Sequence, residues 1–121
     1  MEAVFQISED ILIACVKGEI DHHNAAPLRN SIDESMKAFG CSRLILDFSG
    51  VEMMDSSGIG VVLGRYKKLR KNGGTLCISG CSEHIERVLD MAGVFSLIRM
   101  ADDIENAICI LQGQEQMRME V

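Results

Sequence analysis

The chain has 121 residues, 47% of them hydrophobic, and a net charge of -6 at pH 7. This length and composition favour a single folded domain with its own core and argue against a disordered chain. The acidic balance argues against a nucleic-acid-binding surface, and no apolar run reaches the roughly 18 residues of a membrane span. The first residues also lack the basic region of a signal peptide. We therefore expect a cytoplasmic protein with no direct contact to nucleic acid or membrane.

Apolar runs separated by polar turns predict the strands. A weak alternation near the start is typical of an edge strand. The next run is rich in branched residues, as buried strands are, and Gly18 and Asp21 are expected to end it. The expected strands span residues 4–7, 11–16, 44–48, 75–78 and 95–98.

Helices are expected between the later strands. The first, over residues 24–39, tolerates Pro27 in its first turn and should stop at Gly40. Ser82 caps a helix that runs to about residue 91, and Asp102 with Glu105 resembles a capping box that opens a last helix, to about residue 111. The apolar faces of these helices include Leu28, Ile32, Ser35, Met36, Phe39, Ile85, Val88, Leu89 and Ala92.

A further helix over residues 56–71 carries the most informative motif, a pair of adjacent serines at its start. Asp55 is a good N-cap, because its carboxylate can accept hydrogen bonds from the free N–H groups of the first turn. Ser56 and Ser57 then lie at a helix N-terminus, which tolerates an anion. A serine there can be a nucleophile, a phosphate-binding group, a phosphoacceptor or only part of a cap.

The alternation of strands and helices predicts an α/β fold with a mainly parallel sheet. In such sheets, functional residues gather in the loops that follow the carboxyl ends of strands. The segments 19–24 and 55–60 are two such loops, and they are expected to converge.

Hydrolase and metal chemistry fit these loops poorly. A serine hydrolase needs a Gly-x-Ser-x-Gly turn, but Met54 and Asp55 precede Ser56. Asp21, His22 and His23 are too few to enclose a metal, and consecutive side chains on extended backbone point to opposite sides. Cys77, Cys81 and His84 lack the second ligand pair of a structural zinc site, so the five cysteines are expected to be buried thiols and no cofactor is expected.

A nucleotide site is a weaker possibility at the same helix start. Gly58, Gly60 and Gly64 are spaced one residue off the dinucleotide fingerprint, and they lie inside the expected helix instead of the turn before it. The simpler interpretation is that these glycines let the helix approach the sheet or a partner closely. Among the chemical roles of the serines, the phosphoacceptor fits best, although a plain cap is common.

Three segments resemble one protein family: GEIDHHNA at 18–25, MDSSGIGV at 54–61 and GRYK at 64–67, with LDMAGVF at 89–95 in support. The chain is similar to the anti-sigma factor antagonists, small bacterial STAS-domain proteins, and most of all to those that act in sporulation. The resemblance implies a small mixed, mostly parallel sheet, with helices packed mainly on one side. It covers residues 4–111, and we expect a STAS domain over 1–113 and a polar tail over 114–121.

The resemblance also implies a function without catalysis. Such proteins bind an anti-sigma factor that is also a serine kinase, and this releases the sigma factor. The kinase phosphorylates the first serine of the motif, here Ser56, and a serine phosphatase restores the free form. The resemblance and the loop positions give these partner-binding candidates: Asp21, His22, Asn24, Asp55, Ser57, Gly58, Ile59, Gly60, Gly64, Arg65 and Lys67.

Some alternatives stay open at this point. Glu19 is a further candidate for the rim, and Tyr66 fits either the core or the contact surface, whereas Arg65 and Lys67 are expected to be exposed. The protein is expected to be a monomer when free. The competing functions are a STAS regulator of a general stress pathway and a nucleotide-binding protein that uses the helix start at Gly58–Gly64.

Overall fold

The structure, a computed structural model, describes the backbone of residues 1–120 and the side chains of residues 1–113. Strands and helices alternate after an initial pair of strands. In chain order the elements are β1 (Glu2–Ser8), β2 (Ile11–Ile20), α1 (Ala25–Phe39), β3 (Arg43–Met54), α2 (Ser56–Lys71), β4 (Thr75–Ser79), α3 (Glu83–Met91), the 3-10 helix η1 (Val94–Ser96), β5 (Arg99–Ala101) and α4 (Ile104–Glu120).

The five strands form one sheet in the order β1-β2-β3-β4-β5. β1 is antiparallel to β2 and lies at the edge, whereas β2, β3, β4 and β5 pair in parallel. A tight turn suffices for the first connection, but each parallel connection needs a crossover, which α1, α2 and α3 supply. The predicted mixed, mostly parallel sheet is therefore confirmed.

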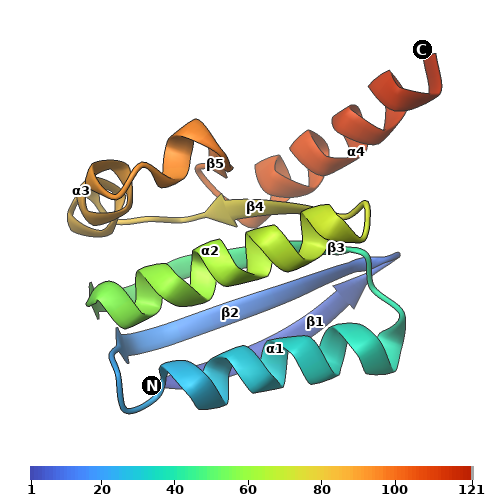
Figure 1. The fold of residues 1–121 in the computed structure, drawn as a ribbon. Helices are drawn as coiled ribbons and strands as arrows, with labels where there is room; N and C mark the ends of the chain where they lie inside the picture. The colour runs from blue at the N-terminus through green and yellow to red at the C-terminus, as the bar shows by residue number, and fades with distance from the viewer. Residues whose placement is uncertain (121) are drawn as a thin grey trace.

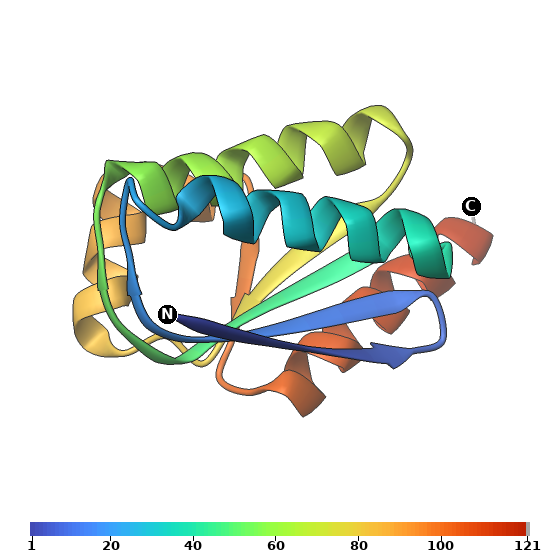
Figure 2. The ribbon, with the colours of Figure 1, turned by 90° about the horizontal axis from the view of Figure 1, so that it is seen from below.

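The helices cover the two faces of the sheet unequally (Figures 1 and 2). The larger core lies beneath α1, α2 and α3, where Leu28 and Ile32 of α1 and Val62 of α2 pack on strand residues such as Leu44. On the opposite face α4 alone contributes Ala107 and Leu111, which pack on Ile11, Ile45 and their neighbours. Helices thus pack mainly on one side, as predicted.

Two strands are longer than their apolar runs predict. Gly18 does not end β2; it lies within the strand at a φ of 93°, beside a shift in register with β3. The strands continue together until Ile20 pairs with Met54. The polar segment after Phe48 is therefore extended because it pairs with β2, which no local pattern reveals.

The chain after α3 differs most from the prediction. Phe95 lies in η1 and not in a strand, and the last strand is the short β5 that follows it. Asp103, not Asp102, caps α4, since its Oδ1 accepts from the Asn106 N–H at 2.8 Å. The α4 backbone continues to Glu120, past the predicted end near residue 111, and the side chains of the predicted tail at 114–121 lie outside the described residues.

Three expectations of burial are also wrong. Phe39, at the end of α1, is 63% exposed, and Ala92 is exposed after α3. All five cysteines are free thiols, but Cys109 is exposed and only Cys77 is fully buried. Among residues 1–120, no helix combines the length and apolar character needed to cross a membrane.

Candidate functional site

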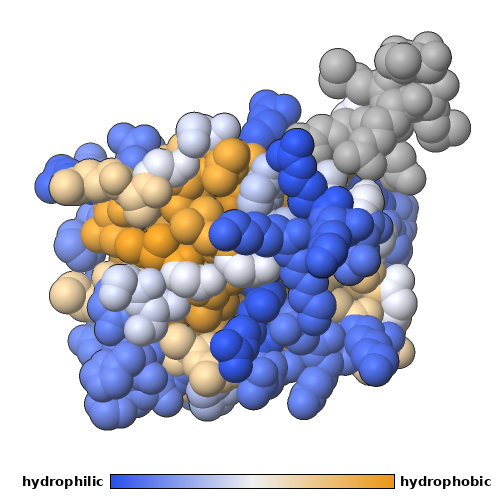
Figure 3. Space-filling view, viewed as in Figure 1, coloured by the Kyte–Doolittle hydropathy of each residue, from blue (hydrophilic) through white to orange (hydrophobic). Residues whose placement is uncertain are grey.

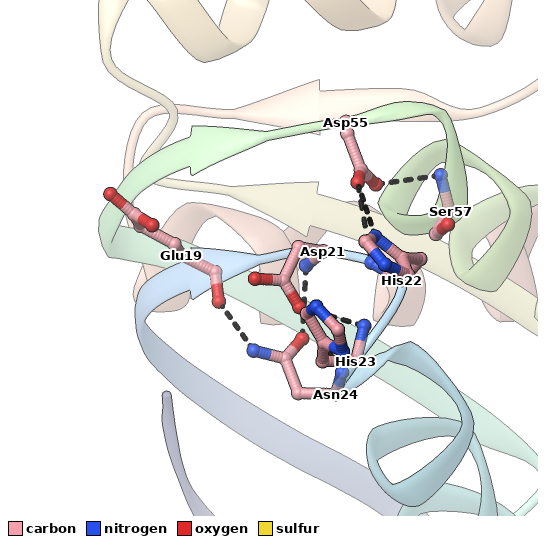
Figure 4. Close-up of polar contacts among 7 residues, drawn as sticks. All are labelled: Glu19, Asp21, His22, His23, Asn24, Asp55 and Ser57. Atoms are coloured by element: carbon pink, nitrogen blue, oxygen red, sulfur yellow. Dashed lines mark hydrogen bonds and ion pairs between the residues drawn. The ribbon is translucent and has the colours of Figure 1, made fainter.

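Two loops meet at the carboxyl end of the central strands, as predicted. Ile20 and Met54 are paired neighbours at the ends of β2 and β3, so the two chains leave the sheet side by side. The Asp55 N–H then donates to the Ile20 carbonyl at 3.1 Å. The segment 21–24 and the start of α2 consequently lie side by side (Figure 4).

Asp55 joins these two loops through its side chain. Its Oδ1 accepts from the Ser57 N–H at 2.8 Å, which makes it the N-cap of α2. Its Oδ2 accepts from the His22 N–H at 3.2 Å, and His22 Nδ1 lies 4.0 Å from the same oxygen. Desolvation would raise the pKa of Asp55, but backbone N–H donors from Ser57, Gly58 and His22 outweigh it and lower that pKa below its usual value.

The loop before α1 is held by its own polar side chains (Figure 4). Asp21 Oδ1 accepts from the N–H groups of His23 and Asn24, at 2.9 and 3.2 Å. Asn24 accepts in return from the Asp21 N–H at 3.0 Å and donates to the Glu19 carbonyl at 2.9 Å. Asp21 and Asn24 therefore shape the loop, whatever they contact outside it.

The two histidines differ from their predicted arrangement. Their backbone is a turn and not an extended strand, so the side chains of His22 and His23 lie together, with ring centroids 3.9 Å apart. Both are exposed. Within residues 1–113, no three His, Cys, Asp or Glu side chains are grouped so that they could hold a metal ion.

The two serines are not equivalent. Ser56 is the first residue of α2 and is exposed, and its hydroxyl makes no hydrogen bond within residues 1–113. Ser57 is half-buried, and Asp55 holds its backbone N–H. A reagent or enzyme that approaches the helix start from solvent therefore meets Ser56 first.

The three glycines of α2 have different surroundings. Gly58 is buried, and a Cβ there would lie 2.4 Å from Met54 Cγ and 3.1 Å from Ile20 Cγ2. Gly58 thus lets the helix approach the ends of β2 and β3, as the simpler interpretation predicts. A Cβ at Gly60 or Gly64 would meet nothing within 4 Å. Close packing inside this chain therefore does not require glycine at these two positions. The open space beside them can accommodate a partner.

The basic residues of α2 differ in their exposure to solvent. Lys67 is exposed, as predicted, but Arg65 is only 8% exposed, which contradicts the expectation that both are exposed. Its Nε lies 3.1 Å from Asp33 Oδ1 on α1, so an ion pair with a neighbouring helix draws it inward. Tyr66 is half-buried against the core, and its hydroxyl accepts from Arg70.

An apolar surface adjoins the helix start. Ile59 and Leu63 of α2 and Phe95 of η1 are only partly buried where they pack on the larger core. Figure 3 shows hydrophobic surface between α2 and α3, beside the N-terminal half of α2. Ser56 and this apolar surface therefore lie on the same part of the molecule.

Sequence reasoning missed the residues that support this site. Ile20 and Met54 form the surface against which Gly58 packs, and Asp33 holds Arg65. Ile20 and Met54 are apolar residues at strand ends, and their pairing could have been inferred only by extending both strands. Asp33 carries no local signal, because its partner lies on another helix.

Comparisons with known proteins find similar sequences and a similar fold. Residues 2–107 match the family model of the STAS domain. An anti-sigma F factor antagonist from Paenibacillus polymyxa is 35% identical over 102 residues, which cover 84% of this chain and 87% of that protein. An anti-sigma-B factor antagonist from Bacillus subtilis is 31% identical over 93 residues, which cover 77% and 84%. The structure of the anti-sigma factor antagonist SpoIIAA in its unphosphorylated form superposes with a TM-score of 0.73 at 26% identity, covering 93% of this chain and 99% of that chain.

Proposed function

The chain belongs to the STAS-domain family and, within it, to the anti-sigma factor antagonists, and from that premise we propose that phosphorylation of Ser56 controls its binding to a serine-kinase anti-sigma factor. In the free form it binds the kinase, and the sigma factor is released. In the phosphorylated form it no longer competes, until a serine phosphatase removes the phosphate. The protein acts in the cytoplasm as a monomer and catalyses no reaction of its own.

The observation that carries the proposal is the position of Ser56. Its hydroxyl is exposed and unpaired within the described residues, at the first position of a helix whose N-cap is already filled by Asp55. Phosphate adds close to two negative charges at pH 7. A helix N-terminus favours such a charge, so the phosphorylated protein keeps its fold. The switch then acts at the interface, where the phosphate beside Asp55 repels acidic groups of the partner.

The same surface offers a place for the partner. Gly60 and Gly64 leave space on α2 that no residue of this chain fills, and they follow Ser56 at intervals of four residues along one side of the helix. Ile59 supplies partly buried apolar area, and Lys67 supplies an exposed charge. Asp21, His22 and Asn24 form the neighbouring rim, whereas Arg65 contributes by holding α2 against α1.

The relatives suggest which sigma factor is involved. The relative named for sigma F is the more similar, at 35% identity over 102 residues, against 31% over 93 residues for the relative named for sigma B. We propose that the chain acts in the sigma F pathway, in sporulation. A role with sigma B, in a general stress pathway, is the second candidate, because that relative is almost as similar.

The test combines the protein with the anti-sigma kinase encoded beside it and ATP. The phosphate is located by mass spectrometry, and binding to the kinase is measured by calorimetry before and after modification. We expect one phosphate on Ser56 and weaker binding once it is present. Ser56→Ala should bind without being modified, and Ser57→Ala, the matched control, should still be phosphorylated at Ser56. Modification of Ser57, or equal binding by both forms, would contradict the proposal.

A further inference from the structure

A cavity lies between α1 and α2, away from the serines. Its walls are the C-terminal halves of both helices and the turns that follow them, and its volume is about 410 Å³. That volume falls within the range of small-molecule sites, roughly 300–1,000 Å³. Since a helix rises about 1.5 Å per residue, Arg65, the wall residue of α2 nearest the serines, lies about 13 Å along the helix from Ser56. The cavity is therefore separate from the proposed phosphorylation site.

One part of the cavity wall is apolar. Met36 near the end of α1, Cys41 after it and Leu69 of α2 all line the cavity and pack against the larger core. Burial raises the pKa of the Cys41 thiol, so this group is an uncharged part of the wall. A ligand that fills the cavity needs an apolar portion to cover these side chains.

The buried Arg65 guanidinium lines the same cavity. Its Nε contacts Asp33 Oδ1 at 3.1 Å as an ion pair, but neither Nε nor the buried Nη1 donates an aligned hydrogen bond within the described residues. Burying charged donors without hydrogen bonds is costly, and a guanidinium stays charged at neutral pH. Arg65 therefore places an incompletely hydrogen-bonded positive charge in the cavity wall, with its Nε and Nη1 atoms covered by their neighbours.

The local charge is opposite to that of the whole chain. Three cations, Lys37, Arg65 and Lys68, line the cavity together with two acids, Asp33 and Glu34, although the chain as a whole carries a net charge of -6. Asp33 already contacts two of these cations, since Lys68 Nζ lies 3.4 Å from its Oδ2. An additional anion would balance the remaining positive charge.

We propose that this cavity binds a small amphipathic carboxylate, such as a medium-chain fatty acid anion. Its carboxylate contacts Arg65 and Lys68, and its hydrocarbon chain lies on Met36, Cys41 and Leu69. The cavity does not overlap the surface around Ser56. Binding of this ligand therefore does not depend on the kinase partner.

The probe is octanoate, titrated into the isotope-labelled full chain while amide NMR signals are followed. We expect saturable shifts at residues 33–42 and 65–74, with the signals of residues 55–58 unchanged. The matched probes are 1-octanol and octylammonium, which have the same chain length without a negative charge. They should bind about tenfold more weakly or not at all, since they lose a charged hydrogen bond.

Two neighbouring lysines provide the matched variants. Lys68 lines the cavity, whereas Lys67 is an exposed neighbour outside it. Lys68→Ala should weaken octanoate binding by about threefold, as loss of an exposed ion pair does, and Lys67→Ala should not change it. Cys41→Phe, which fills the cavity, should abolish the shifts while the rest of the spectrum stays folded. Non-saturable shifts, equal affinity for octanol, or shifts confined to the apolar surface between α2 and α3 would overturn the proposal.

Discussion

The backbone N–H of His22 donates to Asp55 Oδ2 at 3.2 Å, and this bond ties the loop before α1 to the start of α2. The other oxygen of the same carboxylate caps α2. One side chain thus fixes the helix that carries Ser56 and the loop that forms the rim beside it. Substitutions of Asp55 by Asn and by Ala separate the two roles.

Asp55→Asn should retain the cap but lose the link to His22. An asparagine has one side-chain acceptor oxygen, which can serve the Ser57 N–H, whereas its amide nitrogen cannot accept from His22. Asp55→Ala loses both bonds and should unfold at a lower urea concentration than Asp55→Asn. If both variants unfold at the same urea midpoint as the unchanged protein, Asp55 does not stabilise the helix start.

The contribution of Asp55 to folding stability should decrease as the pH falls. Because its pKa is lowered in the folded protein, the carboxylate stabilises the fold above the unfolded pKa, and this contribution is lost as the pH falls through the folded value. The stability difference between the unchanged protein and Asp55→Asn should therefore shrink below about pH 4. Urea titrations at several pH values measure this stability difference. A difference that grows on acidification would contradict a lowered pKa for Asp55 in the folded protein.

Gly58 and Gly60 provide a matched pair within one helix. Gly58→Ala places a Cβ 2.4 Å from Met54 Cγ, so overpacking should outweigh the gain in helix propensity and lower stability by about 1 kcal/mol. Gly60→Ala meets no atom within 4 Å and should raise stability by about 0.5–1 kcal/mol. Denaturant unfolding measures both. The same Gly60→Ala variant should bind the kinase more weakly if the partner packs against this side of α2.

Arg65 should matter more for stability than its neighbour Lys68. Both contact Asp33, but Arg65 is buried and Lys68 has a side chain that is 57% exposed. Arg65→Met should cost about 2 kcal/mol, less than a fully buried broken pair because Lys68 still faces Asp33. Lys68→Ala should cost less than about 1 kcal/mol. Equal losses in urea unfolding would show that burial of the guanidinium is not what stabilises α2.

The cysteines should differ in their reaction with iodoacetamide. Burial raises the pKa of Cys77 to about 11 and that of Cys81 to about 12, so at pH 8 both remain thiols and react slowly. Cys109 is exposed on α4 and should be modified first. Peptide mapping after a short reaction identifies the site. Early modification of Cys77 in the folded protein would show that β4 opens readily.

Local signals in the sequence predicted the parts of the fold that depend on neighbouring residues. Asp55, Ser82 and Gly40 end or begin helices where the pattern placed them, because a cap acts on the turn beside it. The convergence of the two loops also followed from the parallel sheet, since carboxyl ends of parallel strands share one edge. The start of α2 was therefore predicted to the residue.

Contacts between distant segments could not be predicted in this way. Arg65 reads as an exposed base beside Lys67, and only Asp33 on α1 explains its burial. The end of β3 has a polar, glycine-containing pattern and is a strand because β2 pairs with it as far as Ile20. The bond from His22 to Asp55 depends on that same pairing. The predictions fail at positions where contacts with distant residues determine the structure.

Ser56→Asp should weaken binding to the kinase without unfolding the protein. A carboxylate at the first position of α2 lies near the positive end of the helix dipole, so stability should stay within about 1 kcal/mol of the unchanged protein. Binding to the kinase should fall sharply, although by less than with phosphate, which carries more charge. Ser56→Asn is the matched control, with similar shape and no charge, and should keep most of the binding. Calorimetry and urea unfolding on the same samples measure both properties. A Ser56→Asp variant that unfolds early would place the switch in the helix itself, because the loss of binding would then follow from the loss of α2.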